Sequence, residues 1–108
     1  MKLIYAIVNN SDTKSVCTSL VNAGYYATKL ASTGGFLSSG STTFLIGVED
    51  DKVDNVITII SEKSRRRKQF VPFVNSVAGV GYISSPPIEV SVGGATIFVT
   101  DVERYEKV

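Results

Sequence analysis

The chain has 108 residues, a net charge of +1, 44% hydrophobic residues and 19% charged residues. This length and composition predict one globular domain over residues 1–108 with a modest core, and they exclude a disordered chain. The nearly neutral charge gives little general attraction to a nucleic acid polymer or to an anionic membrane. No apolar run approaches the roughly 18 residues that a membrane span requires.

The absence of histidine and the presence of a single cysteine, Cys17, exclude several kinds of chemistry. The usual zinc ligands are missing, so we expect no metal site and no cofactor. Cys17 has no histidine to act as its base, which rules out a papain-like catalytic pair. The sequence has no Walker-type lysine after a glycine loop and no dinucleotide-binding glycine motif, so we do not expect an enzyme. A lone cysteine suits a reducing cytoplasm.

The first predicted element is a strand over Lys2–Val8 that is apolar on both faces, which is typical of a strand between two layers. The opening MKLIYAIV runs directly into a polar turn and lacks a small-residue cleavage site, so we read it as a strand and not as a signal peptide. A helix is predicted over about Ser11–Ala23, with apolar residues at helical spacing and Gly24 as its stop. Cys17 lies on the apolar face of this helix, where it is expected to pack as a small core residue.

Two strands joined by a glycine-rich loop follow, over Tyr25–Ser32 and Thr42–Val48. Phe36 and Leu37 are large apolar side chains inside this loop. We expect them to be covered by the loop's own fold, by a second subunit or by a flat ligand such as a nucleobase. Gly47 in the later strand predicts either a close approach of backbone or ligand, or a simple bulge.

A second helix is predicted around the apolar stripe Val53, Val56, Ile57 and Ile60. The acids that precede this stripe lie at the favourable end of the helix dipole. Arg65–Lys68 form a cluster of four cations at the other end of the helix. These cations could meet a phosphate-rich ligand, but we favour the interpretation that they complement the negative end of the dipole.

Gln69–Pro87 is the longest segment without a clear pattern, and it is too apolar for a solvated linker. We expect it to fold over another surface or to pair as a hairpin. Ile88–Val92 and Ala95–Val102 predict two strands that the Gly93–Gly94 turn joins as a C-terminal hairpin. Arg104–Val108 is a polar tail.

The predicted order of elements is that of a ferredoxin-like α+β sandwich, β-α-β-β-α-β, with an extra C-terminal hairpin. Two helices cover only one face of such a sheet, whereas the predicted strands leave no polar face. We expect other copies of the chain to bury the second face, because soluble monomers rarely expose so large an apolar surface. A homotrimer with ligand sites in the clefts between its subunits is the simplest closed arrangement.

Four blocks of sequence, MKLIYAIV, TKLASTGGFL, TTFLIGVED and IEVSVGGATIFVTDVE, span nearly the whole chain. On these blocks the sequence resembles the PII-like cyclic di-AMP receptor family, which comprises trimeric signal transduction proteins of many Gram-positive bacteria. The resemblance implies a homotrimer of PII-like domains that binds a nucleotide second messenger, cyclic di-AMP, in each subunit cleft. The loops over 34–41 and 69–87 would then relay the bound state to an unknown downstream protein.

The resemblance implies a set of ligand-binding residues, which are Tyr26, Thr28, Gly35, Phe36, Leu37, Ser41 and Gly47. Thr28 would hydrogen-bond the ligand, and Gly47 would admit the ligand against the strand. Gly35, Phe36 and Leu37 would offer backbone groups and an apolar wall to one base.

Three features depart from the family pattern. The family usually has asparagine at the position of Ser41, where it could read an adenine edge with a paired donor and acceptor. It often has arginine near the position of Tyr26, whose ring can stack on a base but brings no charge. Pro72–Ser85 lacks the family's P-x-x-P-M-G-G pattern. The alternative function is therefore a ligand-free trimeric interaction or scaffold module of the same fold.

Overall fold

The computed structural model of the chain describes residues 1–31, 40–71, 74–76, 82–84 and 87–108. The strands are β1 (Lys2–Asn9), β2 (Thr28–Ala31), β3 (Ser41–Val48), β4 (Arg67–Val71), β5 (Val74–Ser76), β6 (Tyr82–Ser84), β7 (Ile88–Val92) and β8 (Ala95–Asp101). The helices are α1 (Thr13–Asn22) and α2 (Val53–Ser64), preceded by the short 3-10 helices η1 (Asn10–Asp12) and η2 (Asp50–Lys52).

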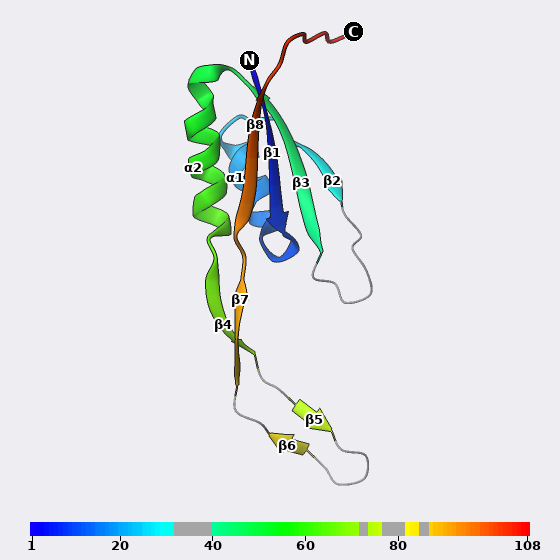
Figure 1. Cartoon of the computed structure of the whole chain (residues 1–108), viewed down its shortest axis with the longest axis vertical. Coiled ribbons are helices and arrows are strands. Elements are labelled where there is room, and N and C mark those ends of the chain that lie inside the picture. The colour runs from blue at the N-terminus through cyan, green and yellow to red at the C-terminus, as the bar shows by residue number, and fades with distance from the viewer. Residues whose placement is uncertain (32–39, 72–73, 77–81, 85–86) are drawn as a thin grey trace.

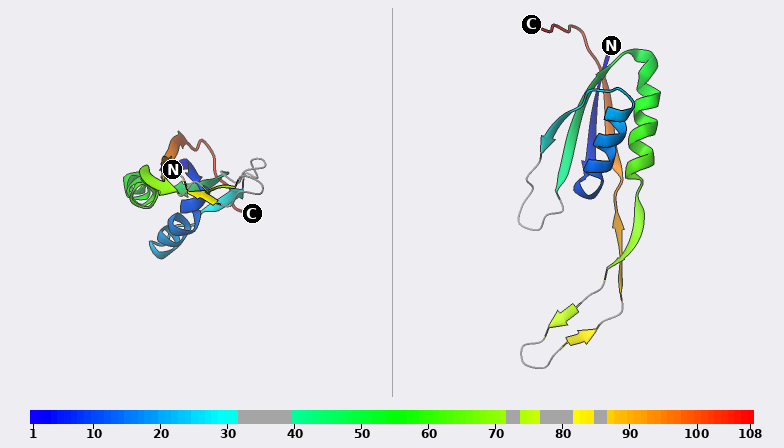
Figure 2. Two further views of the ribbon diagram at one scale, coloured as in Figure 1. Left: turned by 90° about the horizontal axis from the view of Figure 1, so that it is seen from below. Right: turned by 180° about the vertical axis from the view of Figure 1, so that it is seen from behind.

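The main sheet has the strand order β2-β3-β1-β8, and each neighbouring pair in it is antiparallel. This is the order of a ferredoxin-like sheet, in which β1 lies between the third and the last strand. Both helices lie on the same face of the sheet (Figures 1 and 2). The prediction of a small α+β fold with this arrangement is therefore confirmed.

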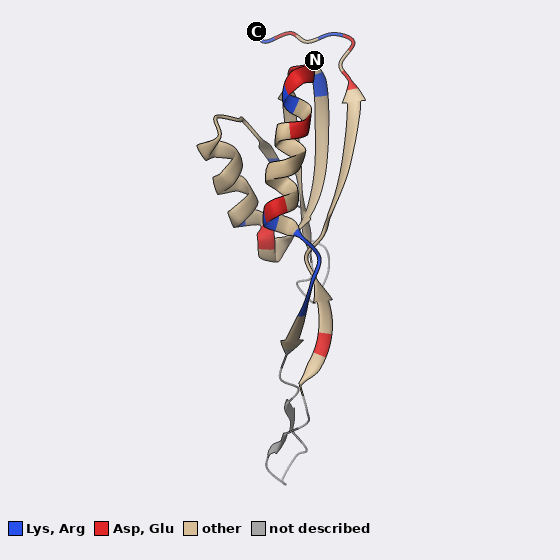
Figure 3. Ribbon diagram, turned by 90° about the vertical axis from the view of Figure 1, so that its left-hand side faces the viewer, with Lys and Arg blue, Asp and Glu red and all other residues tan. Residues whose placement is uncertain are grey.

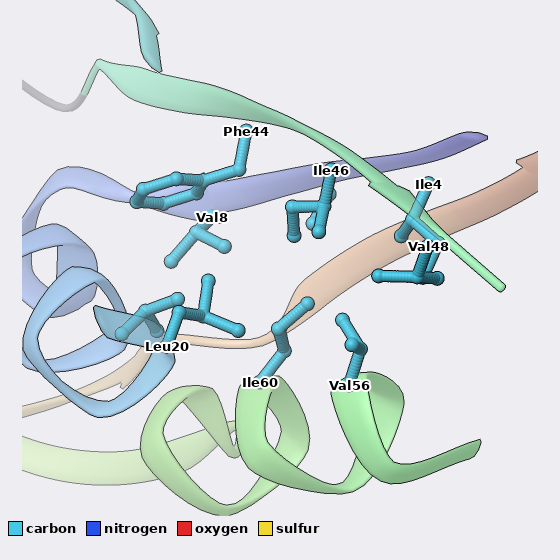
Figure 4. Packing of buried hydrophobic residues seen from close by; sticks show 10 residues of the cluster. Ile4, Val8, Leu20, Phe44, Ile46, Val48, Val56 and Ile60 are labelled. Atoms are coloured by element: carbon cyan, nitrogen blue, oxygen red, sulfur yellow. The ribbon is translucent and has the colours of Figure 1, made fainter. Parts of the chain in front are cut away.

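The hydrophobic core lies between the two helices and the sheet face that they cover (Figure 4). Alternate residues of β1 and β3 point into it, as their periodic burial shows. The buried side chains are Ile4, Ala6, Val8, Val16, Leu20, Phe44, Ile46, Val48, Val56 and Ile60. Cys17 is partly buried and packs against this cluster, as the helical spacing predicts.

The helix α1 ends where its sequence predicts, because Gly24 adopts a φ of +88°. The Gly24 amide donates to the Val21 carbonyl at 2.9 Å, and the Tyr25 amide donates to the Leu20 carbonyl at 3.0 Å. These bonds satisfy the last carbonyls of the helix. They also engage Tyr25 in the helix end, so β2 begins at Thr28 and not at Tyr25, where the sequence predicted it.

No helix of the described residues lies on the other face of the sheet, and we call it the open face (Figure 2). Tyr5 pairs with Leu45 on one side and with Phe98 on the other. Phe98 is 55% exposed and Leu30 is 51% exposed, whereas Tyr5 and Leu45 are half-buried. The open face also carries the threonines Thr28, Thr43, Thr96 and Thr100. It is therefore a mixed apolar and hydroxyl surface and not the continuous apolar one that the sequence suggested.

Below the sheet the chain continues as a two-stranded arm, which gives the molecule extents of 64 × 25 × 21 Å (Figure 1). Within Gln69–Pro87, the segment expected to fold over a surface or to pair, β5 pairs with β6. β4, whose last residues belong to this segment, pairs with β7, which follows it. Both termini lie at the end of the molecule opposite to the arm (Figure 1).

The predicted C-terminal hairpin is wrong, although both of its strands exist. β7 pairs with β4 of the arm, and β8 pairs with β1 of the main sheet. Gly93 and Gly94 have φ values of +82° and +89°, and the Gly94 amide donates to the Ser64 carbonyl at the end of α2. With Gly94 bonded to the end of α2, the chain continues from β7 into β8 and does not fold back to pair β8 with β7.

Candidate functional site

A cavity of about 410 Å³ lies at the end of the sheet where the two termini meet. Its walls are formed by Met1, Leu3, Tyr26, Thr28, Leu45, Gly47, Val102, Tyr105 and Lys107. Pockets of roughly 300–1,000 Å³ with apolar walls and a few polar groups are typical of small-molecule sites. We call this the terminal cavity. It unites three of the residues predicted for ligand binding: Tyr26, Thr28 and Gly47.

Thr28 and Gly47 reach the cavity because of the strand register. Thr28 pairs with Leu45, and Gly47 pairs with Leu3, so all four residues belong to the open face. The pairing of β1 with β3 continues regularly through Gly47, so the alternative of a bulge is wrong. A Cβ atom at Gly47 would lie 3.2 Å from the Met1 Cε atom, inside the cavity wall. The glycine therefore keeps space open beside the strand.

Tyr26 is held at the cavity by its neighbour. The Tyr25 hydroxyl accepts a hydrogen bond from Asn55 Nδ2 at 2.6 Å, which ties this segment to α2. Tyr26 itself is 95% exposed and lines the terminal cavity. Its ring is therefore free to stack on a ligand without breaking a contact of the fold.

Tyr105 and Lys107 of the C-terminal tail also line the terminal cavity, and sequence reasoning missed them. The Val102 amide donates to the Met1 carbonyl at 3.2 Å, which brings the tail to the rim of the sheet. The only local signal is an aromatic residue and a cation spaced two apart in a segment that reads as a polar tail. Their position follows from the pairing of β1 with β8, which carries the tail to the cavity.

Two ion pairs are formed by Met1, which lines the cavity, and by its neighbour Lys2. The N-terminal amino group of Met1 lies 3.0 Å from Asp50 Oδ1, and the Lys2 ammonium donates to Asp101. The hydrogen bond with Asp101 raises the pKa of Lys2, and the same bond lowers the pKa of Asp101. Among the residues that line the cavity, Lys107 is the side-chain cation.

The remaining predicted residues lie elsewhere. Ser41 opens β3 and pairs with Asn9 at the other end of β1. It is six residues from Gly47 along an extended strand, a separation of roughly 20 Å. Within one chain the structure therefore does not bring Ser41 to the terminal cavity. Gly35, Phe36 and Leu37 lie outside the described residues.

Neither a metal centre nor a membrane span is found in the part of the chain that the structure describes. No group of three or more histidine, cysteine, aspartate or glutamate side chains there could hold a metal ion. No helix there is both long and apolar enough to cross a membrane.

The strand order and the two covering helices define a ferredoxin-like α+β protein. The family model described as cyclic-di-AMP receptor matches residues 1–108, so the chain belongs to the cyclic-di-AMP receptor family. The crystal structure of a functionally unknown protein from Pediococcus pentosaceus ATCC 25745 is similar, with 39% sequence identity and a TM-score of 0.77. That match covers 99% of this chain and 96% of the other. The resemblance to the PII-like receptor family is confirmed, and membership supports a role in binding a signal.

Proposed function

We propose that the chain is a signal transduction protein that binds cyclic di-AMP, or a closely related purine nucleotide, between the subunits of a homotrimer. Each subunit is a single PII-like domain over 1–108. The observation that carries this proposal is the coincidence of the family match with the terminal cavity. Tyr26, Thr28 and Gly47 come from separate parts of the sequence, yet they line one space of suitable size.

The chemistry of the terminal cavity suits a purine nucleotide. Leu3 and Leu45 offer an apolar surface to the face of a base, and the rings of Tyr26 and Tyr105 can stack on it. The Thr28 hydroxyl can donate to or accept from the polar edge of the ligand. Lys107 places a cation where a phosphate would neutralise it.

The homotrimer is supported by the open face. Phe98 and Leu30 each expose about half of their surface on this face, beside the half-buried Tyr5 and Leu45. Burial of such side chains by a neighbouring copy removes apolar area from water, at about 25 cal/mol per Å². In a closed ring, a neighbouring subunit would cover this face on every copy of the chain. The neighbour would also supply the missing wall of the terminal cavity.

The proposed relay to a downstream protein depends on the loops that follow the strands of the ligand site. The loop 34–41 lies in the chain between β2 and β3 and includes the first residue of β3, and these two strands carry Thr28 and Gly47. A ligand that prefers one position of the strands would shift the population of loop conformations. The segment 69–87 would take part in the same response through the arm. This role requires no catalysis, so the protein is proposed as a receptor and not as an enzyme.

Calorimetric titration of the purified chain with cyclic di-AMP tests the ligand. We expect saturable heat and a raised melting temperature, and a strong loss of affinity in Gly47→Leu, whose side chain would fill the cavity. Thr18→Leu, which adds the same side chain at an exposed position of α1, should bind like wild type. Absence of heat and of a melting shift at millimolar nucleotide would rule out this ligand, and hydrolysis of the nucleotide would show an enzyme.

The alternative is a trimeric scaffold of the same fold that binds no nucleotide. Phe70 is 66% exposed and Ile88 is 45% exposed on the arm, where a partner protein could cover them. Under this alternative, Phe70→Ser would abolish capture of a partner, while cyclic di-AMP would leave that capture unchanged. Under the receptor proposal, cyclic di-AMP changes the amount of partner captured.

A further inference from the structure

Four consecutive cations, Arg65–Lys68, follow α2 (Figure 3), and only two of them form ion pairs among the described residues. Arg67 Nη2 lies 2.9 Å from Asp12 Oδ1, and Lys68 Nζ lies 3.2 Å from Glu89 Oε1. None of the ion pairs formed among the described residues includes Arg65 or Arg66. Two neighbouring guanidinium groups are thus left without an acidic partner in that part of the chain.

Arg65 and Arg66 line a cavity of about 470 Å³ at the junction of the arm and the sheet. We call this the junction cavity. Its other walls are Ile7 of β1, Ser61 and Ser64 of α2, the Gly93–Gly94 turn and the beginning of β8, and its lining includes no acidic side chain. It is therefore a concave surface whose lining carries two positively charged side chains.

The turn allows the Arg66 side chain to lie close to the backbone. A Cβ atom at Gly94 would stand 3.7 Å from Arg66 Cβ and 3.8 Å from Arg66 Nε. The absence of a side chain at Gly94 leaves this edge of the junction cavity open to a ligand. At Gly93 there is no such space, because an added Cβ atom would lie 2.7 Å from the Arg65 carbonyl oxygen.

At the C-terminal end of α2, groups other than the side chains of Arg65 and Arg66 donate to backbone carbonyls. The Ser64 carbonyl accepts from the Gly94 amide, and the Arg65 carbonyl accepts from Arg67 Nη1 at 3.2 Å. The Ile60 carbonyl accepts from the Ser64 hydroxyl. The carbonyls of Ser64 and Arg65 thus have other donors, so the side chains of Arg65 and Arg66 are not needed to satisfy these two groups.

We propose that the junction cavity is a second ligand site, which binds a small polyphosphate through Arg65 and Arg66. A guanidinium group binds phosphate oxygens in a bidentate manner, so two adjacent groups suit two linked phosphates better than one. A volume of about 470 Å³ also exceeds what a single phosphate fills. This site shares no lining residue with the terminal cavity and lies at the opposite end of β8. The second site therefore does not depend on nucleotide binding in the terminal cavity.

Titration with inorganic pyrophosphate tests this second site, by calorimetry at about 0.15 M ionic strength, where long-range attraction is screened. We expect saturable binding to wild type and at least roughly tenfold weaker binding to Arg65→Gln/Arg66→Gln, which loses the charge-assisted hydrogen bonds. Lys14→Gln/Lys63→Gln is the matched control, because it removes the same charge from two exposed lysines outside both cavities. Circular dichroism and the melting temperature should show all variants folded.

Three outcomes would overturn the proposal. These are an absence of pyrophosphate binding to wild type at millimolar concentration, an equal loss in both double variants, and a parallel loss of cyclic di-AMP binding in the arginine variant. The last would make the junction cavity part of the nucleotide site. Binding of pyrophosphate without any binding of cyclic di-AMP would support the second site while contradicting the proposed receptor.

Discussion

Both terminal nitrogens of Arg67 contact the carboxylate of Asp12, at 2.9 and 3.2 Å. Asp12 is only 5% exposed, whereas the Arg67 side chain is half-exposed, so the pair joins the first residue of the arm to the interior. The hydrogen bond with Asp12 raises the pKa of Arg67. Because β4 begins at Arg67, this bidentate contact determines where the arm leaves the sheet.

Gly93→Ala should destabilise the protein more than Gly94→Ala. Both positions have positive φ, which costs an alanine roughly 1–2 kcal/mol. At Gly93 the new Cβ would also lie 2.7 Å from Arg67 Nη1 and from the Arg65 carbonyl oxygen, whereas at Gly94 its nearest neighbour is 3.7 Å away. Urea unfolding of the two variants measures the difference directly. Equal losses would show that the contact between Asp12 and Arg67 tolerates the added methyl group.

The ion pair between Lys2 and Asp101 should give a stability contribution that is lost in acid. The folded pKa of Asp101 lies below its ordinary value of 3.8, because Lys2 donates a hydrogen bond to its carboxylate. A carboxyl group with a lowered folded pKa stabilises the protein above the unfolded pKa, and this effect disappears as the pH falls through the folded pKa. Wild type should therefore exceed Asp101→Asn in urea midpoint at about pH 6, and the two should converge near about pH 2.

At high pH, the stability contribution of the same ion pair should fall as the pH rises. The folded pKa of Lys2 lies above its ordinary value of 10.5, with the hydrogen bond to Asp101 as the main cause. Its contribution is present below that ordinary value and is lost as the pH rises through the folded pKa. A constant difference between wild type and Asp101→Asn at all pH values would mean that the substitution acts through something other than this ion pair.

The elements of the main sheet could be predicted because their apolar residues repeat with the period of the local structure. Val16 and Leu20 recur at helical spacing, and the alternation around Phe44 and Ile46 is that of a strand. The pairing of β7 with β4 could not be predicted in this way. Gly93–Gly94 is an acceptable hairpin turn by its sequence, and only the distant Ser64 carbonyl decides which way the chain leaves it.

Only those residues of the terminal cavity that lie in or near a recognised block of sequence could be predicted as ligand-binding residues. Thr28 and Gly47 belong to recognisable blocks of sequence, whereas Tyr105 and Lys107 enter the cavity through the pairing of β1 with β8. The predicted ferredoxin-like order places β1 beside the last strand, but it does not say which side chains of the tail beyond β8 reach the cavity. Ser41 lies just before the block TTFLIGVED, and β3 extends it away from the cavity, so a role in ligand binding would require a neighbouring subunit.

Phe98→Lys should dissociate the proposed trimer while leaving the monomer folded. Phe98 is 55% exposed on the open face and pairs with Tyr5, so a charge there would be buried against the neighbouring copy. Val21→Lys is a suitable control, because Val21 is 60% exposed on α1, away from that face. Sedimentation should give about three chain masses for wild type and the control, and one chain mass of 11.6 kDa for Phe98→Lys. A wild-type species of one chain mass would remove the basis for clefts between subunits.

Tyr26→Arg should strengthen the binding of cyclic di-AMP at low salt. Tyr26 is 95% exposed and lines the terminal cavity, so its replacement disturbs no packing and adds a second cation near Lys107. A charge-assisted hydrogen bond to phosphate is worth about 1.5–3 kcal/mol, which is at least roughly tenfold in affinity. Thr18→Arg adds the same charge on α1 and should change the affinity little. Weaker binding by Tyr26→Arg would instead show that the tyrosine ring stacks on the base and that the arginine cannot replace it.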